Sequence, residues 1–245
     1  MQLAIVVLTI LVVAVILVSL KQQRKQADEG HSFTSYQLRA QQYVLHGNFD
    51  DAKSEIEQAI QNNPEDGLNY YALGVIYYNL KQYSKALKNL KQALLIDRGN
   101  WDAWFLTGRV YFERHDHDKA LKYYQKAAEV NPSFTKALFG MATILFDRGF
   151  IEDAADIYKR IITIDPMSAN AHYNLGSCFL ELGMFKESIK EHEIAAGIDP
   201  NNAYAHYWVG YSYIQLNEKN RAAEAFAKSL ERGYDGAANA LKDLI

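Results

Sequence analysis

The four prolines of this 245-residue chain all lie at the same phase of a 34-residue period. Pro64 precedes Pro132 by two periods, and Pro166 and Pro200 follow at single-period intervals. The same period carries a glycine column and an alanine column: Gly74, Gly108, Gly176 and Gly210, then Ala52, Ala86, Ala120, Ala154 and Ala222. A period of this length predicts stacked units that bury their apolar faces on their neighbours, because one unit alone is too small to enclose a core.

Each period contains two stretches with helical spacing, as the unit 101–134 shows. Its small and aromatic residues recur at intervals of three and four: Trp104, Thr107, Gly108 and Tyr111, then Ala120, Tyr124 and Ala127. This spacing predicts two amphipathic helices, over 101–114 and 118–130. Residues 115–117 predict a turn, and Pro132 predicts the end of the second helix because proline lacks an amide hydrogen. We expect the glycine and alanine columns where the two helices cross closely.

The spacing of these residues resembles the tetratricopeptide repeat family. The motif in this unit is Trp104-x2-Thr107-Gly108-x2-Tyr111, then Ala120-x3-Tyr124 and Pro132. Six such repeats cover residues 33–66, 67–100, 101–134, 135–168, 169–202 and 203–236. The resemblance implies an all-α, right-handed superhelical solenoid whose first helices line a concave groove, and a protein that binds peptides or protein surfaces without catalysis of its own. Residues 237–245 are expected to form a short capping helix, because the end of a solenoid needs a polar outer face.

Some members of this family dock chaperones by clamping a C-terminal carboxylate with lysine and asparagine side chains. Here Gln37 and Gln41 stand where such a set would begin, and aromatic residues stand at the later lysine positions. Asn174 is a single isolated match. The sequence therefore predicts no carboxylate clamp in the groove.

Residues 3–20 form an uncharged, strongly apolar run at the start of the chain. As a helix this run would be about 27 Å long at ~1.5 Å per residue, which is close to the ~30 Å hydrocarbon thickness of a bilayer. We predict a transmembrane anchor over residues 1–20 that contacts the lipid bilayer. Two alternatives are a cleaved signal peptide, although the basic start and small-residue cleavage site are absent, and a helix buried in a core.

Three basic residues follow this run immediately: Lys21, Arg24 and Lys25. By the positive-inside rule they place residues 21–245 on the cytoplasmic side of a membrane. Residues 21–32 are polar, carry both charges and predict a short spacer between the anchor and the repeats.

Composition and motifs argue against several classes of function. The formal net charge is −3, from 26 basic and 29 acidic residues, so nucleic acid is not expected as a partner. Cys178, the single cysteine, falls in a core column and predicts a buried packing residue. No nucleophile motif, phosphate loop or zinc motif is present, so we expect no enzyme activity, cofactor or metal.

A run of histidine and aspartate residues offers one alternative, a metal site. The run His115-Asp116-His117-Asp118 in an inter-helix turn has side chains that bind divalent ions. The favoured interpretation is a solvated turn with Asp118 as the N-cap of the next helix. Three other histidines, His172, His192 and His206, occupy columns held elsewhere by large aromatic residues and are expected to pack.

Aromatic columns predict where a partner binds. One contains Tyr71, Phe105, Phe139, Tyr173 and Tyr207, and another contains Tyr78, Phe112, Phe146, Leu180 and Ile214. We expect both on the face opposite the contact between paired helices, where they could clamp apolar side chains of a peptide. The alternative is that these rings pack on neighbouring helices and hold the solenoid together.

Two further features point to particular ligands. Glu113, Asp147 and Glu181 recur at single-period intervals, which favours a basic partner unless Arg109 or other nearby arginines neutralise them. The last repeat gathers four aromatic residues on one helix, which are Tyr204, Tyr207, Trp208 and Tyr211. An exposed patch of this kind is a binding site, and packing against residues 237–245 is the alternative.

The predicted function is a membrane-anchored scaffold or adaptor that binds a partner protein or peptide, basic or apolar, in the groove. The groove residues are Tyr71, Phe105, Arg109, Phe112, Glu113, Phe139, Phe146, Asp147, Tyr173, Asn174, Glu181, Tyr207, Trp208 and Tyr211. The alternative is an assembly, secretion or processing factor that presents client proteins to a separate membrane enzyme or translocase.

Overall fold

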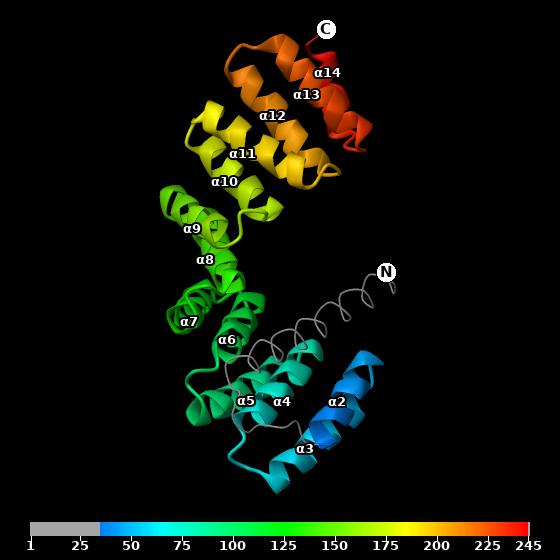
Figure 1. Ribbon diagram of the computed structural model, residues 1–245, viewed down its shortest axis with the longest axis vertical. Helices are drawn as coiled ribbons and strands as arrows, with labels where there is room; N and C mark the ends of the chain where they lie inside the picture. The colour runs from blue at the N-terminus through cyan, green and yellow to red at the C-terminus, as the bar shows by residue number, and fades with distance from the viewer. Residues whose placement is uncertain (1–34, 245) are drawn as a thin grey trace. The chain divides into compact units, whose positions relative to one another are not determined.

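The computed structural model describes residues 35–244, which contain thirteen α-helices and no strand (Figure 1). The contacts divide the chain at Asn131 and Pro132 into two compact units. The first unit contains α2 (Ser35–Leu45), α3 (Phe49–Asn62), α4 (Gly67–Asn79), α5 (Tyr83–Ile96), α6 (Trp101–Glu113) and α7 (His117–Val130). The second contains α8 (Thr135–Asp147), α9 (Ile151–Ile164), α10 (Ala169–Glu181), α11 (Phe185–Ile198), α12 (Ala203–Gln215), α13 (Lys219–Glu231) and α14 (Gly236–Lys242).

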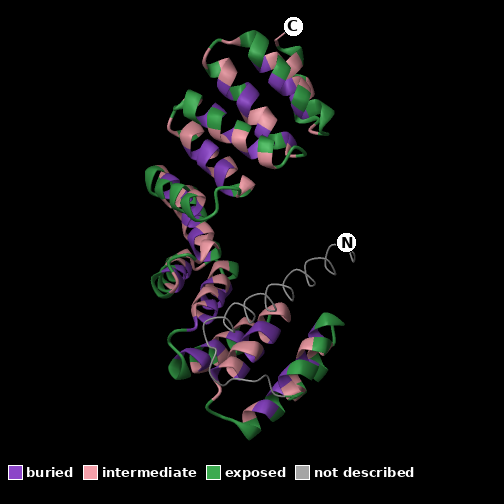
Figure 2. Ribbon diagram, viewed as in Figure 1, coloured by how far each residue is buried: buried purple, intermediate pink, exposed green. Residues whose placement is uncertain are grey.

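Each repeat is a pair of helices, as the spacing predicted. In the first unit α2 packs on α3, α4 on α5 and α6 on α7, and α3 and α5 also contact the first helix of the next pair. The second unit is built the same way and ends with α14 packed on α13. Buried residues form stripes along the sides of the helices that face their neighbours (Figure 2). The predicted all-α architecture of stacked helix pairs is confirmed, and a superhelix continuing through both units stays a prediction.

The glycine column lies where paired helices cross. A Cβ atom built on Gly108 would lie 2.6 Å from Cδ1 of Tyr124 and 3.2 Å from the backbone oxygen of Ala120. The same conflict arises between Gly176 and His192, whose Cε1 would be 2.7 Å away. A large residue of the second helix therefore occupies the space that a side chain on the first would need. The expectation of a close crossing is confirmed.

The second helix of each repeat ends at a turn that the proline column only partly explains. Helix α5 ends at Ile96 although Arg98 stands at the proline phase. The side chain of Asp97 accepts a hydrogen bond of 2.8 Å from the amide of Gly99. Asp165 and Asp199 accept equivalent bonds of 3.2 Å from the amides two residues later. This turn, in which a side chain replaces a backbone acceptor, stops the helix in repeats with and without proline.

The turns between paired helices share one residue with a positive φ angle, again at the repeat period. The residues are Gly47, Lys81, His115, Gly149, Gly183 and Asn217. This left-handed position ends the first helix, and glycine adopts it without the steric cost that a side chain brings. His115 has a φ of 58°, so the first histidine of the run at 115–118 is a turn residue.

One sequence prediction in this turn is wrong. Helix α7 begins at His117, and its N-cap is Asp116, whose side chain accepts a bond from the amide of Lys119. Asp118 was expected to be the cap but lies in the first helical turn. The helix starts earlier because the left-handed His115 reverses the chain within a single residue.

The predicted anchor at residues 3–20 and the spacer at residues 21–32 lie outside the described residues. Within 35–244, no helix has the length and apolar character needed to cross a bilayer. Helix α14 falls in the segment expected to cap the solenoid, and its Ala237 is fully buried beside Ala222 and Phe226.

Candidate functional site

The first aromatic column packs inside the helix pairs. Four ring pairs connect a first helix to the second helix of its own repeat, with centroid distances between 5.2 and 5.9 Å. These pairs are Phe105 with Tyr124, Phe139 with Tyr158, Tyr173 with His192 and Tyr207 with Phe226. Tyr71 packs against the core cluster of its own unit. For these four rings the expectation of a position opposite the helix-pair contact was wrong, because the large second-helix residues at the crossing extend under them. All five residues of the column are half-buried, so their role in a partner-binding groove stays a prediction.

The second column is also partly used for packing. Phe112 lies edge-on to His117, with ring centroids 5.2 Å apart, and Phe146 is half-buried. Tyr78 takes part in a polar cluster that spans two repeats of the first unit. Burial raises the pKa of the Tyr78 hydroxyl to about 12.

In that polar cluster, Arg109 connects the ring to an acid. The guanidinium Nη2 of Arg109 donates to the Tyr78 hydroxyl at 2.7 Å and lies 3.6 Å from Oε1 of Glu113. The Tyr78 hydroxyl in turn donates to Glu113 at 3.3 Å. Glu113 is therefore neutralised by Arg109, as the alternative interpretation proposed. Asp147 and Glu181 are exposed at the ends of α8 and α10, in the other unit, and a row of all three carboxylates stays a prediction.

The second unit carries a cluster of aromatic rings centred on α12. The indole Nε1 of Trp208 donates a hydrogen bond of 3.0 Å to the hydroxyl of Tyr173 on α10. Trp208 also lies edge-on to Tyr207 at 5.2 Å and to Tyr211 at 5.7 Å between ring centroids. Burial raises the pKa of Tyr173, and the bond from Trp208 partly offsets that rise. These contacts fix the orientation of the rings across two repeats.

Tyr234 completes this cluster from the loop after α13. Its ring centroid lies 4.7 Å from that of Tyr204 and 5.0 Å from that of Tyr207. We define the aromatic cluster as six residues: Tyr173, Tyr204, Tyr207, Trp208, Tyr211 and Tyr234. Sequence reasoning missed Tyr234 because the residue stands at the proline phase, where it resembles a local departure from the repeat.

The aromatic cluster combines a buried base with exposed tips. Tyr207 packs over the core of α13 and α14, as the packing alternative predicted. Tyr204 and Tyr211 remain 55% and 39% exposed. Helix α12 contains no aspartate, glutamate, lysine or arginine. The surface therefore offers rigid apolar rings with hydroxyl edges, which suits the apolar side chains and backbone of a protein segment.

Cys178 and His172 are structural in this arrangement. Cys178 is fully buried, and burial raises the pKa of its thiol to about 12. His172 bonds to Glu191 at 2.7 Å through Nδ1 and to the carbonyl of Pro166 at 3.1 Å through Nε2. Asn174 is half-buried.

The turn that contains His115 and His117 is stabilised by an ion pair between Asp116 and Lys119. The carboxylate of Asp116 binds the ammonium of Lys119 at 2.6 Å, which lowers the pKa of the acid. Across residues 35–244, no three histidine, cysteine or acidic side chains are grouped so that they could hold a metal ion.

Comparison with protein families gives matches along most of the described chain. A family model described as tetratricopeptide repeat matches residues 38–94 and 71–133. Another, described as TPR repeat, matches 142–183, and a third, again tetratricopeptide repeat, matches 169–202 and 203–232.

Similar folds occur among solved structures. The crystal structure of YrrB, described as a TPR protein with an unusual peptide-binding site, has a TM-score of 0.68 and 22% identity over 76% of this chain and 97% of that one. The pilF protein of Pseudomonas aeruginosa has a TM-score of 0.70 and 14% identity over 85% of this chain and 96% of that one. MamA has a TM-score of 0.64 and 21% identity, with 69% and 92% covered.

One curated relative is similar over a short segment. Neutrophil cytosol factor 2 of Bos taurus is 33% identical over 58 residues, which are 24% of this chain. The chain spans only 11% of the length of that relative.

Proposed function

Because this chain belongs to the tetratricopeptide repeat family, whose members mediate protein–protein interactions, we propose that it docks an apolar segment of a partner protein on the aromatic cluster. The fold is typical of scaffolds that act by binding and not by catalysis. YrrB, a protein of similar fold that is described as having a peptide-binding site, supports a peptide or protein as the kind of partner.

The single observation that carries this proposal is the exposure of Tyr204 and Tyr211 on a rigid support. The ring of Tyr204 packs on that of Tyr234, with centroids 4.7 Å apart, and the ring of Tyr211 packs on that of Trp208, with centroids 5.7 Å apart. Aromatic residues with a fixed orientation lose little conformational entropy when a partner binds, so more of their contact energy appears as affinity. Tyrosine and tryptophan are also enriched among the residues that dominate binding energy.

We further propose that the protein performs this docking at a membrane. The uncharged run at residues 3–20 is long enough to span a bilayer, and the basic residues after it favour a cytoplasmic location for the repeats. The spacer at residues 21–32 would keep the start of the repeats close to the membrane surface. In this role the protein recruits or scaffolds its partner at the lipid boundary.

The proposal is tested by quantitative co-purification from native membranes. The variant Tyr204→Ser with Tyr211→Ser removes the two exposed rings and leaves the packed rings in place. The matched control is Leu95→Ser with Leu230→Ser, which removes two other exposed apolar side chains. We expect at least tenfold less partner to co-purify with the tyrosine variant than with the wild type, which corresponds to a loss of ~1.4 kcal/mol or more of binding free energy. The control should co-purify as much partner as the wild type.

The same experiment separates the scaffold from its alternative. Deletion of residues 1–32 should release the protein from membranes while the partner still co-purifies with it. A partner identified as a membrane enzyme or a translocase subunit would favour a factor that presents clients. Equal recovery with the tyrosine variant and the wild type would contradict docking on the aromatic cluster.

A further inference from the structure

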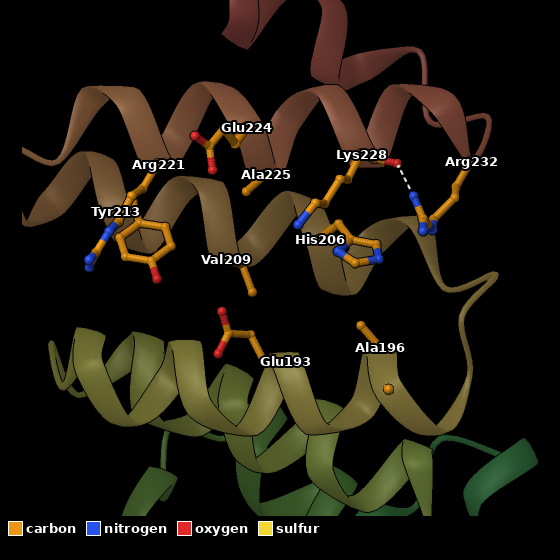
Figure 3. Close-up of a pocket in the computed structure, with 11 residues that line it drawn as sticks. Glu193, Ala196, His206, Val209, Tyr213, Arg221, Glu224, Ala225, Lys228 and Arg232 are labelled. Atoms are coloured by element: carbon orange, nitrogen blue, oxygen red, sulfur yellow. Dashed lines mark hydrogen bonds between the residues drawn. The ribbon is translucent and has the colours of Figure 1, made fainter.

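A pocket of about 390 Å³ lies between α11, α12 and α13 in the second unit (Figure 3). It is lined by Glu193, Ala196, Gly197, His206, Val209, Tyr213, Arg221, Glu224, Ala225, Lys228 and Arg232. By helical spacing, His206 and Val209 lie on the side of α12 that faces away from Trp208 and Tyr211. The pocket is therefore a different surface from the aromatic cluster and is not needed for the function proposed above.

The floor of the pocket is apolar and closely packed. Ala196 is 7% exposed, Val209 4% and Ala225 6%, and Val209 and Ala225 belong to one core cluster. A volume of this size exceeds what a single amino-acid side chain fills and lies within the range of ligand pockets. The floor therefore suits an aliphatic side chain together with a short stretch of peptide backbone.

One end of the pocket gathers three nitrogen-bearing side chains. Figure 3 shows Lys228 and Arg232 beside His206 at this end. The Nε2 atom of His206 is buried and has no hydrogen-bond partner in the part of the chain that the structure describes. Burial, and then the charges of Arg232 and Lys228, lower the pKa of His206. A buried polar atom beside two cations is satisfied most directly by an anion that accepts hydrogen bonds.

Arg232 is held in place for such a role. Its Nε donates to the carbonyl of Pro200 at 2.7 Å and its Nη1 to the carbonyl of Lys228 at 3.0 Å, while Glu231 lies 3.8 Å from Nη1. The ammonium of Lys228, by contrast, has no hydrogen bond or ion pair to any residue within 35–244. Lys228 is thus the cation available to a ligand, and Arg232 contributes fixed positive charge.

The opposite end of the pocket limits what the anion can be. Figure 3 shows Glu193, Glu224 and Arg221 on the side of the pocket away from Arg232, and the Arg221 guanidinium is paired with Glu218 at 2.9 Å. Two carboxylates would repel a ligand that is negative along its whole length, such as a phosphorylated chain. A ligand with a single carboxylate next to an apolar group can contact both the basic end and the apolar floor while its carboxylate stays away from Glu193 and Glu224.

We infer that this pocket binds a peptide segment in which an acidic side chain lies next to an aliphatic one. The carboxylate contacts Lys228 and His206, and the aliphatic side chain lies on Val209 and Ala225. The glutamates at the other end set the direction of the peptide, because its carboxylate is repelled from them.

The test uses the full chain in a mild detergent and two synthetic probes, acetyl-Leu-Glu-Leu-amide and acetyl-Leu-Gln-Leu-amide. Affinity is measured by calorimetry, and the site is identified from the ¹³C signals of labelled histidine, with His206→Gln to assign the signal of that residue. We expect the glutamate probe to bind at least about tenfold more tightly than the glutamine probe, as a charged hydrogen bond implies. Its binding should shift the His206 signal and raise the pKa of that histidine.

The variant Lys228→Gln should weaken the glutamate probe by about tenfold, whereas Lys219→Gln, on the same helix but outside the pocket, should leave its affinity unchanged. Circular dichroism verifies that both variants fold. Equal affinity for the two probes, an equal loss with Lys219→Gln, or an unshifted His206 signal would each overturn the inference. Displacement of the probe by inorganic phosphate at equal concentration would instead identify a general anion site and would also overturn it.

Discussion

The two units join neighbouring first helices with different chemistry. In the first, α4 and α6 are connected by Tyr78 and the ion pair of Arg109 with Glu113. In the second, α10 and α12 are connected by the bond from Trp208 to Tyr173, within a cluster of rings. The repeat fixes which helices meet but not how they are joined, so one scaffold can carry a charged surface in one unit and an aromatic surface in the other.

The units also differ at their helix crossings and turns. Tyr124 covers Gly108 in the first unit, where His192 covers Gly176 in the second. Among the turn residues with positive φ, the first unit has one glycine beside Lys81 and His115, whereas the second has two glycines beside Asn217. Each of these differences predicts that the two units respond differently to mutation or solution conditions.

The largest effect is expected at the crossing that both units share. Replacing Gly108 or Gly210 by leucine would drive a side chain into Tyr124 or Phe226 and should cost about 3 kcal/mol of stability. The control Gly197→Leu has no atom within 4 Å of its Cβ and should be neutral or slightly stabilising. Urea unfolding gives the free energies, and hydrogen exchange shows which unit has opened. A loss spread evenly over both units would contradict their independence.

A pH titration should separate the two crossings. Burial lowers the pKa of His192 from 6.5 to about 4 in the folded protein. As pH falls, the unfolded state binds a proton at His192 before the folded state does, so protonation favours unfolding. The contribution of neutral His192 to the free energy of unfolding is therefore complete above pH 6.5 and is lost between pH 6.5 and 4, at up to ~1.4 kcal/mol per pH unit. Hydrogen exchange at pH 7 and 5 should show weakening of the second unit in particular. His192→Phe should reduce that difference and leave the smaller contribution of His206, whose pKa burial also lowers, whereas the exposed-site control His115→Phe should retain the full difference.

Smaller effects of opposite sign are expected at the turns. His115→Gly should stabilise the first unit by up to about 1 kcal/mol, because glycine adopts a φ of 58° without steric cost. Gly183→Ala, at the matching position of the second unit with a φ of 71°, should destabilise that unit by about the same amount. Thermal unfolding followed by circular dichroism measures both. A gain from Gly183→Ala would show that the left-handed turn is not required.

The smallest effect concerns the connections between first helices. Arg109→Met should cost about 0.5 kcal/mol at low salt and almost nothing in 1 M NaCl, since the Arg109 and Glu113 side chains are 43% and 39% exposed and their attraction is screened. Trp208→Phe should cost about 1 kcal/mol at either salt concentration, because it removes a hydrogen bond between uncharged groups. Equal salt dependence in the two variants would remove the distinction between an ionic and an aromatic connection.

Much of the fold was predictable because its determinants recur at a fixed period. The proline, glycine and alanine columns placed the helix pairs and their crossings. The Asn or Asp column that ends the second helices is also present in the sequence, at residues 63, 97, 131, 165 and 199, but the prolines beside it are the stronger helix-stop signal and mask it. The role of His115 could not be read from composition, because the left-handed position accepts glycine, lysine, histidine or asparagine.

The site was less predictable from the sequence. Side chains that contact a neighbour within one helix pair and side chains that contact the next helix pair recur with the same period, so the period does not distinguish them. Phe105 and Phe139 were expected in the groove although they pack on Tyr124 and Tyr158. Tyr234 has no counterpart in the other repeats, so no column could reveal that it supports Tyr204. The basic end of the pocket depends on Lys228 and His206, which come from different helices and meet only when those helices pack.

The most direct test of the central proposal places a photo-reactive benzophenone amino acid at Tyr211 in the full chain, in native membranes, with the same group at Leu230 as the control. Both positions are exposed, and only the first belongs to the aromatic cluster. We predict one defined protein adduct from position 211, no such adduct from position 230, and loss of the adduct when Tyr204→Ser is added. The same adduct from both positions, or none from position 211, would contradict docking on the aromatic cluster.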